Sequence, residues 1–164
     1  MPNALIRLAT PDDAELFYQH TLRHMNESGN NDLIFHPIQD MATWDTKENI
    51  AKLRERWGLK AATGQIWERA WALIIDNKII GSATIRANKL PASSHRATFA
   101  IGIEKPWRRK GFGQQLMTKA LGWAKDQDFL GWIDLEAFSN NSEALALYKS
   151  FRFKEVGTTV DIFR

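Results

Sequence analysis

The sequence predicts one mixed α/β domain in which a β-sheet is flanked by helices. Its 164 residues match the usual size of a single domain, so residues 1–164 are expected to fold together. Hydrophobic residues make up 44% of the chain and charged residues 25%, which is the balance of an ordinary globular protein. Strand-like and helix-like segments follow in the order β-α-α-β-β-β-α-β-α-β, which predicts six strands and about four helices.

The first third of the chain is predicted to contain one strand, two helices and a long loop. Ala4–Ala9 alternates apolar and polar residues, as a half-buried strand does. Thr10–Asp13 supplies a capping hydroxyl, a proline and two acids, so a helix should begin there and reach about Met25. Asn26–Asp45 is polar and broken by glycine and proline, which is typical of a functional loop. Thr46–Trp57 has apolar residues on one helical face.

The middle of the chain is predicted to be an antiparallel hairpin followed by another strand. Arg69–Ile75 and Lys78–Ala87 are rich in β-forming residues, and Asp76-Asn77 between them favours a two-residue hairpin turn. Arg96–Ile103 follows as a strand with its aromatic and aliphatic residues on one face. Three neighbouring strands are therefore expected from consecutive segments.

The last third is predicted to alternate helices and strands. A glycine-containing basic loop, Arg108–Gly113, is followed by a helix with a 3.6-residue apolar period that reaches about Lys125. Trp132–Phe138 alternates apolar and acidic residues, which predicts a strand. A helix is expected over Ser142–Ser150, and a last strand is expected to begin near Phe153.

The composition excludes several kinds of site. The chain has no cysteine, so it has no disulfide, no cysteine-ligated metal and no catalytic thiol, which suits a reducing cytoplasm. The formal net charge of +3 is too small to indicate nucleic acid binding by itself. No apolar run approaches the ~20 residues that cross a bilayer, and the N-terminus lacks the apolar run of a signal peptide. We therefore expect a cytoplasmic protein without a membrane or nucleic acid partner.

The loop Arg108–Gly113 has the composition of an anion site. The first amides of a helix point outward without partners, and the helix dipole favours negative charge there. Gly111 and Gly113 would let a ligand approach the backbone, and the three basic side chains would attract it. A basic helix start with two loop glycines that binds no ligand explains the same residues equally well.

The named phosphate motifs do not match this loop. The chain has no GxxxxGK[ST] segment, which a P-loop requires. A dinucleotide fingerprint requires a third glycine where this chain has Leu116. Asp134 or Glu136 follows at about the expected spacing of roughly twenty residues, but each lies inside a predicted strand. The dinucleotide interpretation is therefore disfavoured.

A third pattern fits the loop fully. Arg108–Gly113 matches [Q/R]-x-x-G-x-[G/A] between a strand and a helix, and Asn141–Tyr148 matches N-x-x-A-x-x-x-Y one strand and one helix later. Together these segments resemble the GNAT superfamily, the Gcn5-related N-acetyltransferases that use acetyl-CoA. Trp132–Tyr148 is similar to the bacterial ribosomal-protein N-terminal acetyltransferases. The resemblance implies the GNAT fold, with six to seven strands, and direct acetyl transfer to a primary amine without a metal.

The resemblance also implies roles for particular residues. Tyr148 is expected to donate a hydrogen bond or proton to the leaving thiolate, and Glu136 to take the amine proton, with Glu104 as a substitute base. The strand before the loop is expected to splay from its neighbour and hold the pantetheine arm. The expected acetyl-CoA-binding residues are Ile101, Gly102, Ile103, Arg108, Arg109, Lys110, Gly111, Phe112, Gly113, Gln114 and Asn141. Asn141 also fits an ordinary helix N-cap.

The chain departs from the family pattern in two places, and its acceptor stays open. Arg152-Phe153 stands where the family usually has Gly-Phe, and the seventh strand is either compressed into Phe153–Arg164 or absent. A protein N-terminus, an amino acid, a polyamine or an antibiotic amine could be the acceptor, and the protein could be a monomer or a homodimer. Candidate residues lining the acceptor site are Asp32, His36, Asp40, Trp44, Trp57 and Trp67.

Two other functions compete with acetyl transfer. A non-catalytic acyl-CoA-binding module on the same fold would keep the loop but would not need the Tyr148 hydroxyl. A nucleic acid binder would use the basic cluster of the loop and show steeply salt-dependent affinity. The modest net charge and the lack of a second basic stripe count against nucleic acid.

Overall fold

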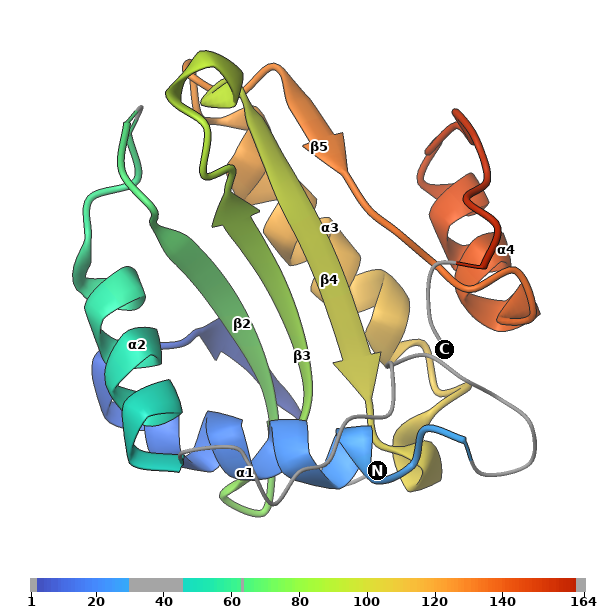
Figure 1. The fold of residues 1–164 in the computed structure, drawn as a ribbon. Coiled ribbons are helices and arrows are strands. Elements are labelled where there is room, and N and C mark those ends of the chain that lie inside the picture. The colour runs from blue at the N-terminus through green and yellow to red at the C-terminus, as the bar shows by residue number, and fades with distance from the viewer. Residues whose placement is uncertain (1–2, 30–45, 63, 162–164) are drawn as a thin grey trace.

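A computed structural model describes residues 3–29, 46–62 and 64–161, which form a twisted sheet with helices on both faces (Figure 1). Within the described residues the sheet has five strands in the spatial order β1-β2-β3-β4-β5. The first four strands pair antiparallel and the fifth pairs parallel to β4, so the sheet is mixed. The strands are β1 Leu5–Leu8, β2 Glu68–Ile75, β3 Lys78–Ala87, β4 Arg96–Ile103 and β5 Trp132–Asp134.

Two apolar layers hold the helices against the sheet. One buried cluster joins α1 and α2 to one face of the sheet, and a larger one joins α3 to the other face with α4 beside it. In Figure 1, α3 passes behind the sheet and α1 crosses in front of its lower end. Alternate residues of β2 enter opposite layers, because neighbouring side chains of a strand point to opposite faces. The helices are α1 Ala14–Met25, α2 Thr46–Gly58, α3 Phe112–Lys125 and α4 Ser142–Ser150.

The helix starts and the hairpin follow the sequence signals. A short 3-10 turn, Pro11–Asp13, leads into α1, and Asp13 accepts hydrogen bonds from the amide and hydroxyl of Thr10. Asp76 and Asn77 both adopt positive φ, at 48° and 59°. Two positive φ values are what a type I′ turn requires, so the predicted hairpin is confirmed.

The strand β4 is paired along one edge and almost unpaired along the other. On the β3 side, every residue from Ala97 to Ile103 has a partner: Ala97 lies opposite Ala87, and Ile103 lies opposite Gly81. On the β5 side only Arg96–Thr98 is paired, opposite Trp132–Asp134, and the two strands then diverge, as Figure 1 shows. An Arg96 to Asp134 ion pair, with Nε 2.8 Å from Oδ2, closes the paired end. The predicted splay is therefore present, and within the described residues no strand pairs with β4 from Phe99 to Ile103 on this side.

The strand count and the last two strands need correction. Five strands are present in the described residues, not six to seven. β5 ends at Asp134 and not at Phe138, because β4 has already turned away and leaves the alternating residues without a neighbour. No strand forms over Phe153–Asp161, where Val156 is 100% exposed and Val160 85% exposed. Most of the predicted loop Asn26–Asp45 lies outside the described residues.

Candidate active site

The loop between β4 and α3 is shaped to present backbone amides. A short 3-10 turn, Lys105–Trp107, follows β4, and Arg109 and Gly111 then adopt positive φ of 60° and 79°. Gly111 is the N-cap of α3, and no side chain caps this helix. A Cβ on Gly111 would have nothing within 4 Å, so the space beside the first amides of α3 is open. This is the geometry of an anion site at a helix N-terminus.

The second glycine of the loop has a different purpose. A Cβ on Gly113 would lie 3.1 Å from Leu147 Cδ2 and 3.8 Å from Ile103 Cδ1. Gly113 therefore lets the first turn of α3 pack closely against α4 and the end of β4. The sequence predicted that both glycines admit a ligand; the geometry gives that opening at Gly111 and close helix packing at Gly113.

The three basic residues of the loop have different surroundings. Arg108 is half-buried: its Nε donates to the carbonyl of Ile103 at 2.8 Å, and its guanidinium pairs with Glu27 beyond the end of α1. Arg109 is exposed and donates to Glu143 of α4 at 2.7 Å. Lys110 Nζ lies 4.7 Å from the centre of the Trp107 ring, a cation–π distance. Arg109 and Lys110 therefore supply accessible positive charge, whereas Arg108 ties the loop to α1 and β4.

The helix α4 carries the predicted Asn141 and Tyr148. Asn141 is the N-cap, and its side-chain oxygen accepts a hydrogen bond from the amide of Ala144 at 3.2 Å. Tyr148, 9% exposed, lies in the larger apolar cluster, and its ring packs on Phe153 with centres 6.1 Å apart. Burial raises the pKa of the Tyr148 phenol to about 12.

The turn after α4 keeps its geometry without the family's glycine. Arg152 takes positive φ, 66°, and its amide donates to the carbonyl of Lys149 at 2.9 Å. The amide of Phe153 donates to the carbonyl of Tyr148 at 3.1 Å. A left-handed conformation is less favourable for arginine than for glycine, but the turn forms and holds Phe153 against Tyr148.

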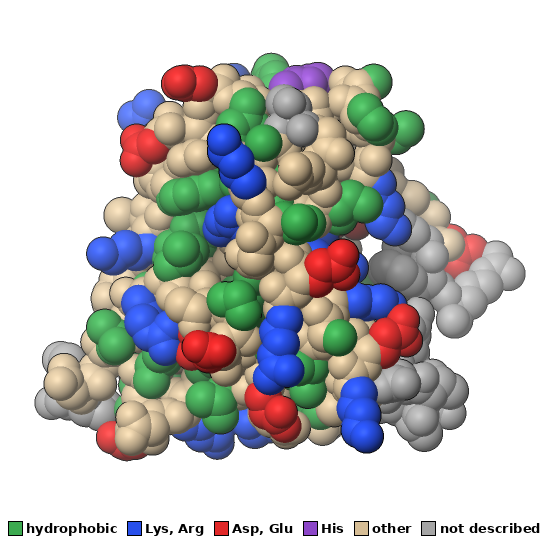
Figure 2. All heavy atoms as spheres, turned by 90° about the vertical axis from the view of Figure 1, so that its left-hand side faces the viewer, with side chains coloured by type: hydrophobic (Ala, Val, Ile, Leu, Met, Phe, Trp, Pro, Cys, Tyr) green, Lys and Arg blue, Asp and Glu red, His purple; other side chains and the backbone are tan. Residues whose placement is uncertain are grey.

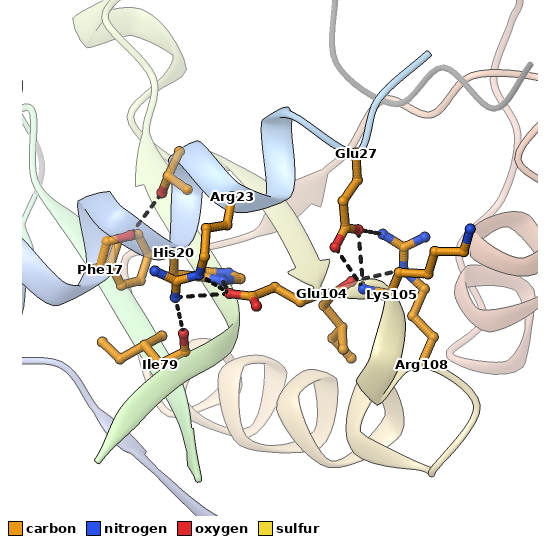
Figure 3. Close-up of polar contacts among 10 residues, drawn as sticks. Phe17, His20, Arg23, Glu27, Ile79, Glu104, Lys105 and Arg108 are labelled. Carbon is orange, nitrogen blue, oxygen red and sulfur yellow. Dashed lines mark hydrogen bonds and ion pairs between the residues drawn. The ribbon is translucent and has the colours of Figure 1, made fainter. Parts of the chain in front are cut away.

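The two predicted bases lie in opposite environments. Glu136 is exposed in the segment beyond β5. Glu104 is 7% exposed and accepts hydrogen bonds from His20 Nδ1 at 3.0 Å and Arg23 Nε at 2.9 Å (Figure 3). Burial lowers the pKa of His20, and the neighbouring Glu104 opposes that shift only partly, so His20 is neutral near pH 7. Glu104 is therefore committed to a buried cluster with two α1 residues, and its geometry does not support a role as base.

The end of α1 is held against the loop between β4 and α3. Both carboxylate oxygens of Glu27 accept from the amide of Lys105, at 2.9 and 3.1 Å, and the same carboxylate pairs with Arg108 (Figure 3). Arg23 also donates to the carbonyl of Ile79 at 2.7 Å. These contacts fix α1 relative to β3, β4 and the loop at once.

His24 lies directly against the unpaired part of β4. A Cβ on Gly102 would lie 2.7 Å from Cε1 and 2.8 Å from Nδ1 of His24, so only glycine leaves room for the ring. The ring of His24 also stacks on His20, with centres 5.9 Å apart and planes 30° apart. The sequence analysis missed His24 and Glu27, although His20, His24 and Glu27 follow the i, i+4, i+7 spacing of one helix face.

Two of the six residues predicted to line the acceptor site are core residues, and the other four are not described. Trp57 and Trp67 are core residues: their indole nitrogens donate to Glu68 Oε1 at 3.1 Å and to the carbonyl of Ala62 at 3.0 Å, and both rings are buried. They therefore belong to the two apolar clusters rather than to a polar acceptor site. The other four candidates lie outside the described residues: Asp32, His36, Asp40 and Trp44.

Among residues 3–29, 46–62 and 64–161, no group of three side chains is arranged to hold a metal ion. In the same residues no helix is both long and apolar enough to cross a membrane. On the face that carries α2, basic and acidic side chains are interspersed rather than gathered by sign (Figure 2).

Comparison with known proteins gives a family match and two partial relatives. A family model described as "Acetyltransferase (GNAT) family" matches residues 35–153. L-amino acid N-acetyltransferase AaaT of Escherichia coli (strain K12) is 30% identical over 84 residues, which cover 51% of this chain and 52% of the relative. Streptothricin acetyltransferase A of Bacillus subtilis (strain 168) is 32% identical over 84 residues, covering 51% and 46%. The matched part of the chain spans about half the length of each of these relatives.

Solved structures share the fold along nearly the whole chain. A GNAT-family acetyltransferase from Streptococcus pneumoniae has a TM-score of 0.76 at 23% identity, covering 98% of this chain and 93% of that one. A Clostridium acetobutylicum predicted acetyltransferase with acetyl-CoA scores 0.69 at 16% identity, covering 98% and 96%. Ribosomal-protein-alanine N-acetyltransferase from Brucella melitensis scores 0.61 at 13% identity, covering 99% of each. At these identities the likeness concerns the fold.

Proposed function

The chain belongs to the acetyltransferase (GNAT) family, and from this premise we propose that it transfers an acetyl group from acetyl-CoA directly to a primary amine. The observation that carries the proposal is the uncapped start of α3 at Gly111, where the space beside the glycine is open. This helix start follows β4, whose edge towards β5 is unpaired beyond Thr98 within the described residues. The pyrophosphate would accept from the first amides of α3, with Arg109 and Lys110 nearby. The pantetheine arm would follow the β4 backbone from Ile103 towards Phe99.

The chain lacks a thiol, so a direct attack by the amine is the natural route. The new N–C bond forms at the thioester carbonyl, whose oxygen becomes anionic and needs hydrogen-bond donors. The amides of Ile101 and Ile103 would serve, because alternate amides of β4 point away from β3 and β5 pairs only as far as Thr98. Asn141 would contribute through its side chain while it caps α4.

Tyr148 would assist the leaving sulfur by a hydrogen bond. A phenol whose pKa is about 12 is a poor acid for a thiolate, since the pKa of a thiol is about 8.5 and the difference corresponds to roughly 5 kcal/mol against full proton transfer. A hydrogen bond from the un-ionised phenol stabilises the developing negative charge without that transfer. The leaving thiolate would later take its proton from water.

The amine proton needs a separate acceptor. Glu136 is exposed beyond β5 and could receive this proton through water. Its exposure suits a solvent-linked base, whereas the buried contacts of Glu104 do not.

The acceptor class is proposed from chemistry that the relatives share. The names of the two curated relatives specify L-amino acids and streptothricin as what those proteins act on, and each offers an amine. We therefore propose a compact polar molecule or a peptide N-terminus with a primary amine as the acceptor of this chain.

The first experiment is an isothermal titration with acetyl-CoA, with NADH and a short DNA duplex as controls at the same salt concentration. We expect heat from acetyl-CoA alone. A panel of L-amino acids, streptothricin, spermidine and an alanine-starting peptide then tests turnover by release of free thiol. Binding without turnover by any amine would favour the acyl-CoA-binding module. A folded protein that binds DNA or NADH but not acetyl-CoA would refute the proposal.

A further inference from the structure

We propose that His24 of α1 accepts the proton that the amine loses during acetyl transfer. The inference rests on the proposed function and gives its acceptor side a catalytic residue. It is carried by the contact between His24 and Gly102 in the unpaired part of β4.

The position of the ring follows from the alternation of β4. Phe99, Ile101 and Ile103 belong to the apolar cluster that packs β4 against α3 and α4. Gly102 lies between two of them and therefore faces the opposite side, towards α1. His24 reaches this point from the last turn of α1, and its ring occupies the volume that a Gly102 side chain would fill. An imidazole thus lies against the backbone that would hold the thioester end of the cofactor.

The same alternation restricts how an amine can approach. The face of β4 towards α3 and α4 carries the buried Phe99 and the half-buried Ile101 and Ile103 of the apolar cluster. The opposite face carries the small residues Ala100 and Gly102, so we expect an amine that attacks a thioester on this edge to come from the α1 side, where it would meet His24. Histidine has an ordinary pKa of about 6.5, which makes it the side chain best matched to take a proton near pH 7.

The stacked neighbour of His24 carries no charge near pH 7. His20, stacked on the His24 ring, is neutral because burial lowers its pKa, and its Nδ1–H donates to Glu104. The ring therefore does not have a second imidazolium beside it. The charged groups that act on His20, the stacked partner of His24, are Glu104, Arg23 and Lys78.

The proposed step balances as follows. The amine nitrogen attacks the thioester carbon, so an N–C bond forms and the C–S bond breaks. The nitrogen loses one proton to an imidazole nitrogen of His24, directly or through one water. Coenzyme A leaves as the thiolate, stabilised by the Tyr148 hydroxyl, and His24 returns its proton to solvent after release of the product.

The first test compares pH profiles of kcat/KM for three variants, with the amine of the panel that reacts fastest. His24→Gln should lower kcat/KM about 100-fold at pH 7, because a positioned acid or base typically contributes at least that much. It should also remove the ascending limb of the profile that the titration of a base produces. His95→Gln makes the same change at an exposed histidine before β4 and should keep the wild-type profile. Glu136→Gln tests the competing base: if His24 takes the proton, this variant should keep the ascending limb that His24→Gln loses.

A second test needs no amine. The ring resonance of His24, identified by its loss in His24→Gln, should move when acetyl-CoA is added and move less with coenzyme A, which lacks the acetyl group. The His95 resonance should stay in place with both ligands.

The outcomes separate this inference from the proposed function. If the wild type acetylates an amine but His24→Gln keeps its rate and its pH limb, His24 only fills space beside Gly102 and the inference is wrong. A loss confined to Glu136→Gln would give the role to that carboxylate. If no amine reacts, an unmoved His24 resonance in the acetyl-CoA complex overturns the inference. Failure of acetyl-CoA to bind would overturn both proposals.

Discussion

The two edges of β4 show how one strand can serve both stability and chemistry. The edge towards β3, here called the paired edge, is hydrogen-bonded along its length and lies over the buried core. The edge towards β5, here called the open edge, is paired only at Arg96–Thr98 within the described residues. Backbone groups used by one strand pair cannot bind a ligand, so a site made of backbone requires an edge that the sheet leaves free. We expect substitutions near the paired edge to change stability and those near the open edge to change binding and rate.

The largest effect should come from Gly111→Glu, at the end of the open edge. A carboxylate beside the uncapped amides would take the place of the pyrophosphate and repel it. We expect the affinity for acetyl-CoA to fall more than about 1000-fold, or roughly 4 kcal/mol, in an isothermal titration. Gly64→Glu is the control, because Gly64 has the same φ of 79° and open space around its Cα. Equal affinity of the two variants would show that the loop does not bind the cofactor.

The next effect should be on stability at the paired edge. Ile85 is fully buried in β3, and Ile85→Ala should lower the free energy of unfolding by about 3 kcal/mol through lost burial and a residual cavity. Ile133→Ala makes the same truncation in half-buried β5 and should lose about half as much. Urea unfolding measures both, and kcat below the melting temperature should stay within threefold. A larger loss of stability for Ile133→Ala than for Ile85→Ala would contradict the expected difference between the two edges.

Tyr148→Phe should affect rate more than stability. Loss of the hydrogen bond to the leaving sulfur should lower kcat about 30-fold, roughly 2 kcal/mol, with cofactor affinity unchanged within twofold. Tyr18→Phe is a matched control, since the buried Tyr18 hydroxyl has no hydrogen-bond partner in the described residues. Steady-state kinetics of both variants give the answer; a fully active Tyr148→Phe would remove the hydroxyl from the mechanism.

The smallest effect should be the pH dependence of stability from His20, which lies where α1 meets the end of β4. Its folded pKa is below the ordinary value, so the unfolded chain binds the proton first. The contribution of His20 is complete above the unfolded pKa of about 6.5 and is lost as the pH falls below it. Through this group, the free energy of unfolding should change by at most about 1.4 kcal/mol per pH unit. The measurement is the urea midpoint at pH 8, 7, 6 and 5. As the pH is lowered, the midpoint should fall less steeply for His20→Gln than for the wild type. Parallel plots of midpoint against pH for the two proteins would contradict this assignment.

The local elements were predictable because their causes are local. Asp76-Asn77 predicts the hairpin because both residues tolerate positive φ, and Thr10–Asp13 predicts the helix start because its side chains satisfy nearby amides. Family membership followed from the spacing of Arg108–Gly113 and Asn141–Tyr148, and the family match confirms it. The particular roles of these site residues stay predictions.

The errors came from contacts between distant segments. Trp132–Phe138 has the alternation of a strand, but its length in the sheet depends on where β4 turns away. Trp57 and Trp67 were predicted near the acceptor because aromatic residues suit cations, yet each indole nitrogen has a partner inside the core. His24 was missed because its importance depends on Gly102, a residue far along the chain that lacks the side chain to exclude the ring.

The order of strands in the sheet also has a kinetic consequence. β2, β3 and β4 pair with their neighbours in the chain, whereas β1 pairs with β2 across most of the N-terminal half, since Leu8 lies opposite Trp71. Closing short loops loses less chain entropy than closing long ones, so the three-stranded meander should form in the folding nucleus. The transition state would then be structured around the Asp76-Asn77 turn, with β1 and β5 added later at the two sides. In a cell, the meander could begin to fold on the ribosome before the C-terminal part of the chain has left it.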